Sequence, residues 1–159
     1  MFSIGDLIVH PMHGAGIIDD IVQEKVAGVL KEYYVFKMPM GGLVLKIPTA
    51  NSKVIGIRTV ISAHEATLLL DSIPDLDVED NNNWNKRYQE NLIRLKSGNL
   101  YEVARVVKAL MHRDLQRGLS TGERKMLHNA RQIIVSELVL AEHCEYEEAE
   151  SLLDQAIRQ

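Results

Sequence analysis

The sequence predicts an α+β protein, with a small SH3-like or Tudor-like β-barrel at residues 1–62 and an all-α helical domain at residues 63–159. Its 159 residues are enough for one ordinary domain or two small ones. Seven of the ten glycines and three of the four prolines lie in residues 1–62, so only this part is dense in turns. The apolar residues recur with a period close to two in the first part and with helical period in the second.

Short strands separated by turn residues are expected in the first part. A turn is expected at Pro39-Met40-Gly41-Gly42, and the other breaks fall near Pro11, Gly28 and Pro48. Strands of this length and spacing are typical of a small barrel. They are predicted at residues 6–9, 15–26, 30–38, 43–47 and 53–57.

The strand predicted at residues 43–47 has two different faces. Period two places Leu43, Leu45 and Ile47 on one side, and Val44 and Lys46 on the other. Two interpretations remain open for it. It is either an ordinary barrel strand with a solvated lysine or an edge strand that can pair with a partner.

Helices with recognisable caps are expected after residue 62. Ser62 with Glu65, and Ser120 with Glu123, have the spacing of a capping box. An acidic, Asn-rich loop is expected from Pro74 to Asn83. Helices are predicted from residue 63 to about 72, from 84 to about 97, from 100 to about 117, from 121 to about 143, and around 146–157.

The charge is unevenly distributed along the chain. Residues 81–131 hold eleven basic and four acidic residues, whereas residues 65–80 and 132–159 are both acidic. Such a basic block is either a nucleic-acid footprint or a solvated helical surface whose charges pair with the acidic flanks.

The sequence offers no recognisable catalytic, cofactor or metal site. His10 and His13 are three residues apart, but no further metal ligand is suitably placed nearby in sequence. The single cysteine, Cys144, excludes an internal disulfide. No membrane span or signal peptide is evident, so we expect a cytoplasmic protein. Because no catalytic or cofactor motif is recognisable, we also expect that it is not an enzyme and needs no cofactor.

The basic block contains the candidate nucleic-acid contacts. Trp84, the only tryptophan, is either a structural residue, as a hydrophobic staple or in the packed core, or an exposed aromatic that stacks on a base or wedges into a minor groove. The start of the Ser120 helix offers free N–H groups suited to a phosphate. With Trp84, the residues assigned to this surface are Lys86, Arg87, Arg113, Arg124, Lys125 and His128. Arg131 is expected on the same outward face as Arg124 and His128.

Several segments have a specific order and spacing: Gly5-Asp6 with His10-Pro11-Met12-His13-Gly14, Lys31-Glu32-Tyr33-Tyr34, Leu45-Lys46-Ile47-Pro48, Asn83-Trp84-Asn85-Lys86-Arg87-Tyr88, Arg113-Asp114-Leu115-Gln116-Arg117-Gly118-Leu119-Ser120 and Met126-Leu127-His128-Asn129-Ala130-Arg131-Gln132. With these segments the chain resembles the CarD/CdnL family of bacterial transcription regulators over nearly its whole length.

The resemblance implies a Tudor-like domain that binds the β subunit of bacterial RNA polymerase, like a similar domain of the transcription-repair coupling factor. It also implies that the helical domain contacts promoter DNA at the upstream edge of the transcription bubble. There the residue matching Trp84 wedges into the minor groove and stabilises the open complex. The polymerase contacts implied here are Lys25, Val44, Lys46 and Pro48. Relatives often carry a basic residue where this chain has Glu24, and can do so at Gln89.

The sequence therefore predicts a monomeric transcription factor that bridges polymerase and promoter DNA, reads few base edges, and associates with the nucleoid through polymerase. One alternative is a protein–protein adaptor without DNA contact, in which the acidic flanks neutralise the basic block. Another is an autonomous DNA-binding protein.

Overall fold

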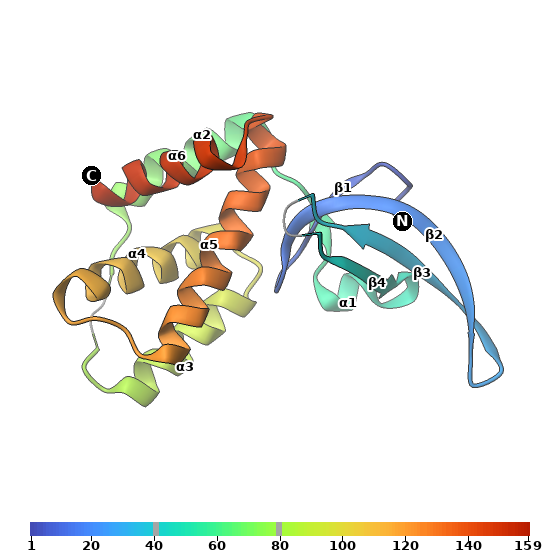
Figure 1. The fold of residues 1–159 in the computed structure, drawn as a ribbon, viewed down its shortest axis with the longest axis horizontal. Coiled ribbons are helices and arrows are strands. Elements are labelled where there is room, and N and C mark those ends of the chain that lie inside the picture. The colour runs from blue at the N-terminus through green and yellow to red at the C-terminus, as the bar shows by residue number, and fades with distance from the viewer. Residues whose placement is uncertain (40–41, 79–80) are drawn as a thin grey trace.

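The computed structural model describes residues 1–39, 42–78 and 81–159. It has two lobes, a strongly curved β-sheet formed by the N-terminal part and a group of helices formed by the C-terminal part (Figure 1). The expectation of an α+β protein is confirmed.

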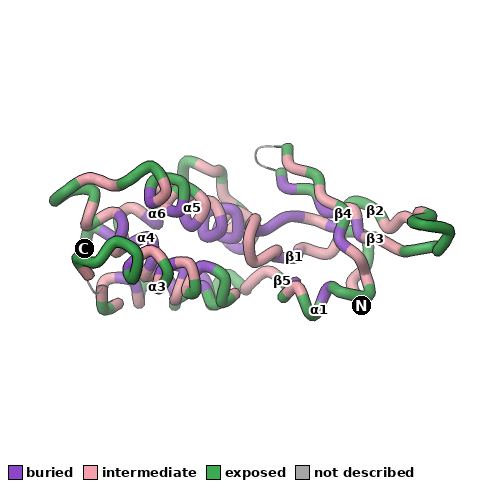
Figure 2. The backbone as a smooth tube through the Cα atoms, turned by 90° about the horizontal axis from the view of Figure 1, so that it is seen from below, coloured by how far each residue is buried: buried purple, intermediate pink, exposed green. Residues whose placement is uncertain are grey.

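Within the described ranges, the sheet has five antiparallel strands in the order β4-β3-β2-β1-β5. Consequently β4 and β5 are its two edges. The long β2–β3 hairpin extends away from the helical lobe and is exposed at its tip (Figures 1 and 2). The strands are β1 (Leu7–His10), β2 (Gly14–Val26), β3 (Val29–Lys37), β4 (Val44–Pro48) and β5 (Arg58–Thr59). The core of the sheet lobe is formed by buried side chains of these strands and of the residues beside them: Ile8, Ile18, Tyr34, Phe36, Met38, Ile47 and Ile57.

The prediction of a strand at residues 53–57 is wrong. A short helix, α1 (Ser52–Ile55), covers residues 53–55 of this segment and follows a 3-10 turn, η1 (Thr49–Asn51). Gly56 ends the helix at φ 95°, and its N–H donates to the carbonyls of Ser52 and Lys53. This left-handed C-cap favours glycine and overrides the β-propensity of Val54 and Ile55. Of the turn predicted at Pro39–Gly42, residues 40 and 41 lie outside the described residues.

The helices predicted after residue 62 are confirmed, and both capping boxes form. Their bounds are α2 (Ala63–Ser72), α3 (Trp84–Lys96), α4 (Leu100–Gln116), α5 (Thr121–Glu142) and α6 (Tyr146–Arg158). A 3-10 turn, η2 (Ile73–Asp75), follows α2, so the predicted acidic loop starts inside this turn. Residues 79 and 80 of that loop lie outside the described residues. The boundary between residues 62 and 63 stays a prediction.

Helix α5 joins the two lobes near the start of β2 (Figures 1 and 2). The backbone N–H of Ala15 donates to Ser136 Oγ at 2.9 Å. The neighbouring Gly14 has φ 108°, and a Cβ added there would lie 2.4 Å from the same oxygen. Only glycine therefore allows the backbone of β2 to approach α5 this closely.

A buried carboxylate completes the contact between the lobes. Glu137 is 1% exposed and accepts hydrogen bonds from both terminal nitrogens of Arg58, each at 2.7 Å. It also accepts from the backbone N–H of Ile61 at 2.9 Å. Because Arg58 lies on β5 and Ile61 just before α2, one side chain fixes the whole connection between the lobes.

We expect Glu137→Ala to lower the free energy of unfolding by about 2–4 kcal/mol, because it leaves a guanidinium and a backbone N–H without their acceptor. The expected loss is smaller than for a fully buried ion pair, because 32% of the Arg58 side chain is exposed. Equilibrium urea denaturation measures the change. The control is Glu142→Ala, a half-buried carboxylate in the last turn of the same helix, for which we expect a change within about 0.5 kcal/mol. Equal effects in the two variants would contradict the assigned role.

Candidate nucleic-acid interface and partner-binding strand

Trp84 is the first residue of α3 and lies at the surface where α3 meets the start of α5. Its indole ring stacks on Tyr88, with centroids 5.0 Å apart and planes inclined by 16°. Its Nε1–H donates to Ser120 Oγ at 3.1 Å. With 42% of the residue exposed, Trp84 is not a core residue, and it follows the N-cap Asn83 instead of preceding it, as a hydrophobic staple would. Of the two interpretations, the exposed aromatic fits the structure.

Two helices begin at this point. The Asn83 side chain caps α3 by accepting from the Lys86 N–H at 3.2 Å, and Ser120 caps α5 by accepting from the Glu123 N–H at 3.2 Å. The positive ends of both helix dipoles therefore lie beside Trp84 and favour a negatively charged ligand.

Arg87 does not belong to the exposed surface. It is 6% exposed, and its Nε and Nη2 donate to the two carboxylate oxygens of Glu123 at 2.9 and 3.2 Å. Its third contact is the carbonyl of Asn81, at 2.7 Å. The expectation that Arg87 faces outward is therefore wrong. The buried face of α3 follows Arg87, Asn91 and Leu95, whereas the apolar period of the sequence predicts Tyr88, Leu92 and Leu95.

The ion pair keeps Glu123 charged. Burial acts to raise the pKa of this carboxyl, but the hydrogen bonds and charge of Arg87, with hydrogen bonds from Ser120, outweigh it and lower the pKa below its usual value. The pair thus ties the start of α5 to α3.

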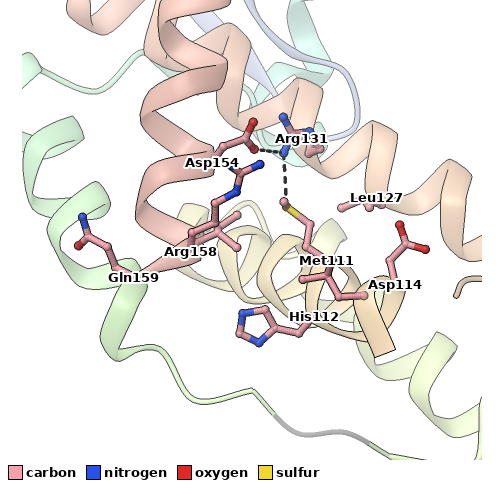
Figure 3. A pocket seen from close by; sticks show the side chains of 10 residues that line it. Met111, His112, Asp114, Leu127, Arg131, Asp154, Arg158 and Gln159 are labelled. Carbon is pink, nitrogen blue, oxygen red and sulfur yellow. Dashed lines mark hydrogen bonds and ion pairs between the residues drawn. The ribbon is translucent and has the colours of Figure 1, made fainter. Parts of the chain in front are cut away.

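Arg131 is also turned inward, against the expectation that it shares an outer face with Arg124 and His128. Its guanidinium donates to Asp154 at 2.6 Å and to Glu150 at 3.3 Å, both on α6. Figure 3 shows it beside Met111, at the edge of a groove of about 580 Å³. Burial acts to lower the pKa of Arg131, but these two carboxylates outweigh it and raise the pKa.

A further base of the block stabilises a turn. Lys108 is 6% exposed, and its Nζ donates to the carbonyls of Ile73, Pro74 and Leu76 at 2.8–2.9 Å. These contacts fix η2 at the end of α2. With Arg87 and Arg131, three bases of the block are therefore engaged inside the helical lobe.

The other predicted contacts remain near the protein surface. Lys86, Arg124, Lys125 and His128 are exposed, whereas Arg113 is half-buried. Arg124 Nε also donates to the carbonyl of Leu119, at 3.3 Å. The exposed bases lie on the first turn of α3 and the first two turns of α5, so the candidate nucleic-acid interface is smaller than the sequence predicts.

Sequence reasoning missed the two side chains that contact the Trp84 ring. The apolar period of the sequence predicts Tyr88 on the inner face of its helix, and the capping-box spacing predicts that Ser120 caps its helix. The i,i+4 spacing of Trp84 and Tyr88 is a signal for their stacking, because side chains four apart are neighbours on a helix. No local signal indicates the bond from Trp84 to Ser120, since it depends on how the helices pack.

The strand β4 has the predicted alternation of faces. Ile47 is buried and Leu43 and Leu45 pack against the sheet core, whereas Val44 and Lys46 are exposed. Of the two interpretations left open, the edge strand is the one observed, because β4 pairs only with β3 among the described strands.

The other predicted polymerase contacts lie around this edge. Pro48, at the end of β4, is half-buried, and Lys25 is exposed near the hairpin tip. Glu24 forms an ion pair with Lys46. About half of each side chain is exposed, 51% of Lys46 and 42% of Glu24, so the pair adds little stability and a bound protein can displace it.

His10 and His13 lie side by side, with ring centroids 4.6 Å apart. The Met12 N–H donates to His10 Nδ1 at 3.1 Å. Burial first, and then the neighbouring His13, lower the pKa of His10 to about 4. Among the described residues, no three His, Cys, Asp or Glu side chains gather as a metal-binding group. Within the same ranges, no helix is long and apolar enough to cross a membrane.

Comparison with known proteins finds a family match for each of the two parts of the chain. Residues 2–61 match the family described as “CarD-like/TRCF RID domain”, and residues 69–154 match “CarD, C-terminal domain”. The chain is also similar to the Bacillus subtilis (strain 168) protein named “Putative transcription factor YdeB”. The two are 35% identical over 138 residues, which cover 87% of this chain and 90% of the relative.

We expect Arg87→Ala to lower the free energy of unfolding by about 3–5 kcal/mol, because it leaves the buried Glu123 carboxylate without its charge partner. Lys86→Ala, one residue away and exposed, is the matched control and is expected to change it by no more than about 0.5 kcal/mol. Urea denaturation of both variants checks this. An Arg87→Ala protein as stable as Lys86→Ala would mean that Arg87 is a surface residue after all.

Proposed function

Because the chain belongs to the CarD family of transcription regulators, we propose that it bridges RNA polymerase and promoter DNA. In this proposal the edge strand β4 binds the polymerase β subunit. The surface around Trp84 contacts DNA at the upstream edge of the transcription bubble and stabilises the open complex. The protein acts as a monomer and is associated with the nucleoid through polymerase.

The observation that supports the DNA contact most directly is the position of Trp84. A half-exposed aromatic ring stands between two helix N-termini, with the exposed Lys86, Arg124 and Lys125 on the same helix starts. An aromatic ring supplies stacking or a minor-groove wedge, and the bases and helix ends supply phosphate contacts. Phosphate contacts position a protein on DNA without reading sequence, so this surface suits binding that is largely independent of sequence.

The polymerase contact is supported by the open edge of β4. An edge strand offers backbone N–H and C=O groups to a strand of a partner, and Val44 and Lys46 lie on its exposed face. In the ribbon, β4 belongs to the sheet lobe and α3 to the helical lobe (Figure 1). One molecule can therefore bind polymerase and DNA at the same time.

The adaptor without DNA contact remains the alternative, and one observation favours it. Arg87, Lys108 and Arg131 are engaged inside the helical lobe, the last of them by two acidic residues of α6. The usable positive charge is thus smaller than the eleven bases of the block suggest. Removing Trp84 separates the two functions, because an adaptor has no use for an exposed stacking ring.

We expect Trp84→Ala to shorten the lifetime of the open promoter complex about five- to a hundredfold, since base stacking on an aromatic is worth about 1–3 kcal/mol. Affinity for polymerase should be unchanged, because β4 supplies that contact. The free energy of unfolding should fall only slightly, whereas replacing a core tryptophan by alanine lowers it by about 3–5 kcal/mol. Decay of preformed complexes after a competitor challenge measures the lifetime.

The control for Trp84→Ala is Tyr101→Ala. Tyr101 lies in the first turn of α4 in the same lobe and is 40% exposed, close to the 42% of Trp84. Complexes with Tyr101→Ala should decay like those of the wild-type protein. A stable Trp84→Ala protein with a normal complex lifetime would favour the adaptor.

We expect Lys46→Glu to weaken binding to the isolated β subunit about tenfold or more, because reversing a charge at an interface turns attraction into repulsion. Lys53→Glu, an exposed lysine on α1, makes the same charge change elsewhere in the lobe and should have no effect. Conversely, Glu24→Gln should strengthen binding, since it releases Lys46 from its ion pair. Titration calorimetry measures all three variants, and equal affinities for Lys46→Glu and Lys53→Glu would refute the assigned surface.

A further inference from the structure

We propose that Ser120 and Tyr88 are positioning residues for Trp84, which hold its indole ring in one orientation before DNA arrives. This inference rests on the proposed function, in which Trp84 contacts DNA. It assigns a second task to Ser120, beyond capping α5.

The first constraint on the ring is stacking. Tyr88 follows Trp84 by one helical turn, and the two rings lie nearly parallel at 5.0 Å. One face of the indole is therefore covered by the phenol ring. The benzene edge of the indole lies close to Gly122, where an added Cβ would be 4.0 Å from Trp84 Cζ2.

The second constraint is the bond to Ser120. A serine hydroxyl has one donor and two acceptor sites. Ser120 Oγ accepts from the Glu123 N–H at 3.2 Å and from Trp84 Nε1–H at 3.1 Å. It donates to Glu123 Oε1 at 3.2 Å. All three sites are used, so the orientation of the hydroxyl is fixed.

The carboxylate that contacts the Ser120 hydroxyl is itself fixed in position. Glu123 is 2% exposed and is paired with the buried Arg87, at 2.9 Å from Arg87 Nε. An unbroken series of contacts therefore runs from Arg87 through Glu123 and Ser120 to the indole. Helices α3 and α5 cannot shift here without breaking one of these contacts.

Such a ring is already ordered in the free protein. A side chain that must be immobilised on binding lowers affinity, so releasing the ring should shorten the promoter-complex lifetime about two- to tenfold. The ring itself would still be present, and the loss should therefore be smaller than in Trp84→Ala.

The test uses Ser120→Gly and the fluorescence of Trp84, the only tryptophan. Glycine is nearly as good an N-cap as serine but has no hydroxyl, so α5 keeps its start while the indole loses its acceptor. The matched control is Ser62→Gly, which changes the other capping box, where Ser62 caps α2 in the same way without a tryptophan. Ser120→Thr keeps a hydroxyl and serves as the rescue.

We expect time-resolved fluorescence anisotropy to show a larger fast depolarisation in Ser120→Gly, and wild-type behaviour in Ser62→Gly and Ser120→Thr. Tyr88→Leu, which removes the stacking ring, should show the same increase, whereas Tyr88→Phe should not. In promoter assays Ser120→Gly should shorten the complex lifetime, but it should add nothing in the Trp84→Ala background, because both changes act through one ring.

The two proposals fail in different measurements. Unchanged anisotropy in Ser120→Gly overturns the positioning role, whatever the promoter assay gives. An additive effect of Ser120→Gly and Trp84→Ala on complex lifetime also overturns it, since Ser120 would then act independently of the ring. A normal complex lifetime with Trp84→Ala instead overturns the proposed DNA contact of Trp84.

Discussion

The buried carboxylate of Glu137, beside the Ser136 hydroxyl, holds the two lobes in their arrangement. This side chain of α5 accepts from Arg58 at the sheet edge and from the backbone at Ile61. The same helix begins at Ser120, which contacts Trp84. Seventeen residues separate Ser120 from Glu137, about 26 Å along a helix. Helix α5 therefore sets a fixed distance between the sheet and the candidate nucleic-acid interface.

The basic block has two uses in the folded protein. Arg87, Lys108 and Arg131 hold together the helices and turns of the helical lobe, each through hydrogen bonds to oxygen atoms. Lys86, Arg124 and Lys125 remain exposed beside Trp84. A count of charges along the sequence treats both groups alike, although only the second is available to a phosphate. The surface is nevertheless suited to DNA, since helix dipoles add to the field of the exposed bases.

Features that depend on near neighbours were predictable. The alternation of β4 and the two capping boxes were identified from spacing alone, and the structure has them where the sequence predicts them. Residues 53–57 were misassigned because Val54 and Ile55 favour a strand, while a single left-handed glycine, Gly56, ends a helical turn there. The predicted inner face of α3 differs by about one residue from the observed one. The reason is that an arginine is expected at the surface unless a buried acidic partner is known.

One can predict from the amino-acid sequence alone the α+β class, the positions of the helices and most strands, and a lone tryptophan beside basic residues. These features follow from hydrophobic period, turn chemistry and caps, which act over a few residues. The partners of Arg87, Trp84 and Arg58, by contrast, are set by the packing of the folded chain. Their partners are 36, 36 and 79 residues away in sequence. Such pairs depend on how whole helices and the sheet pack together, and no short segment specifies that packing.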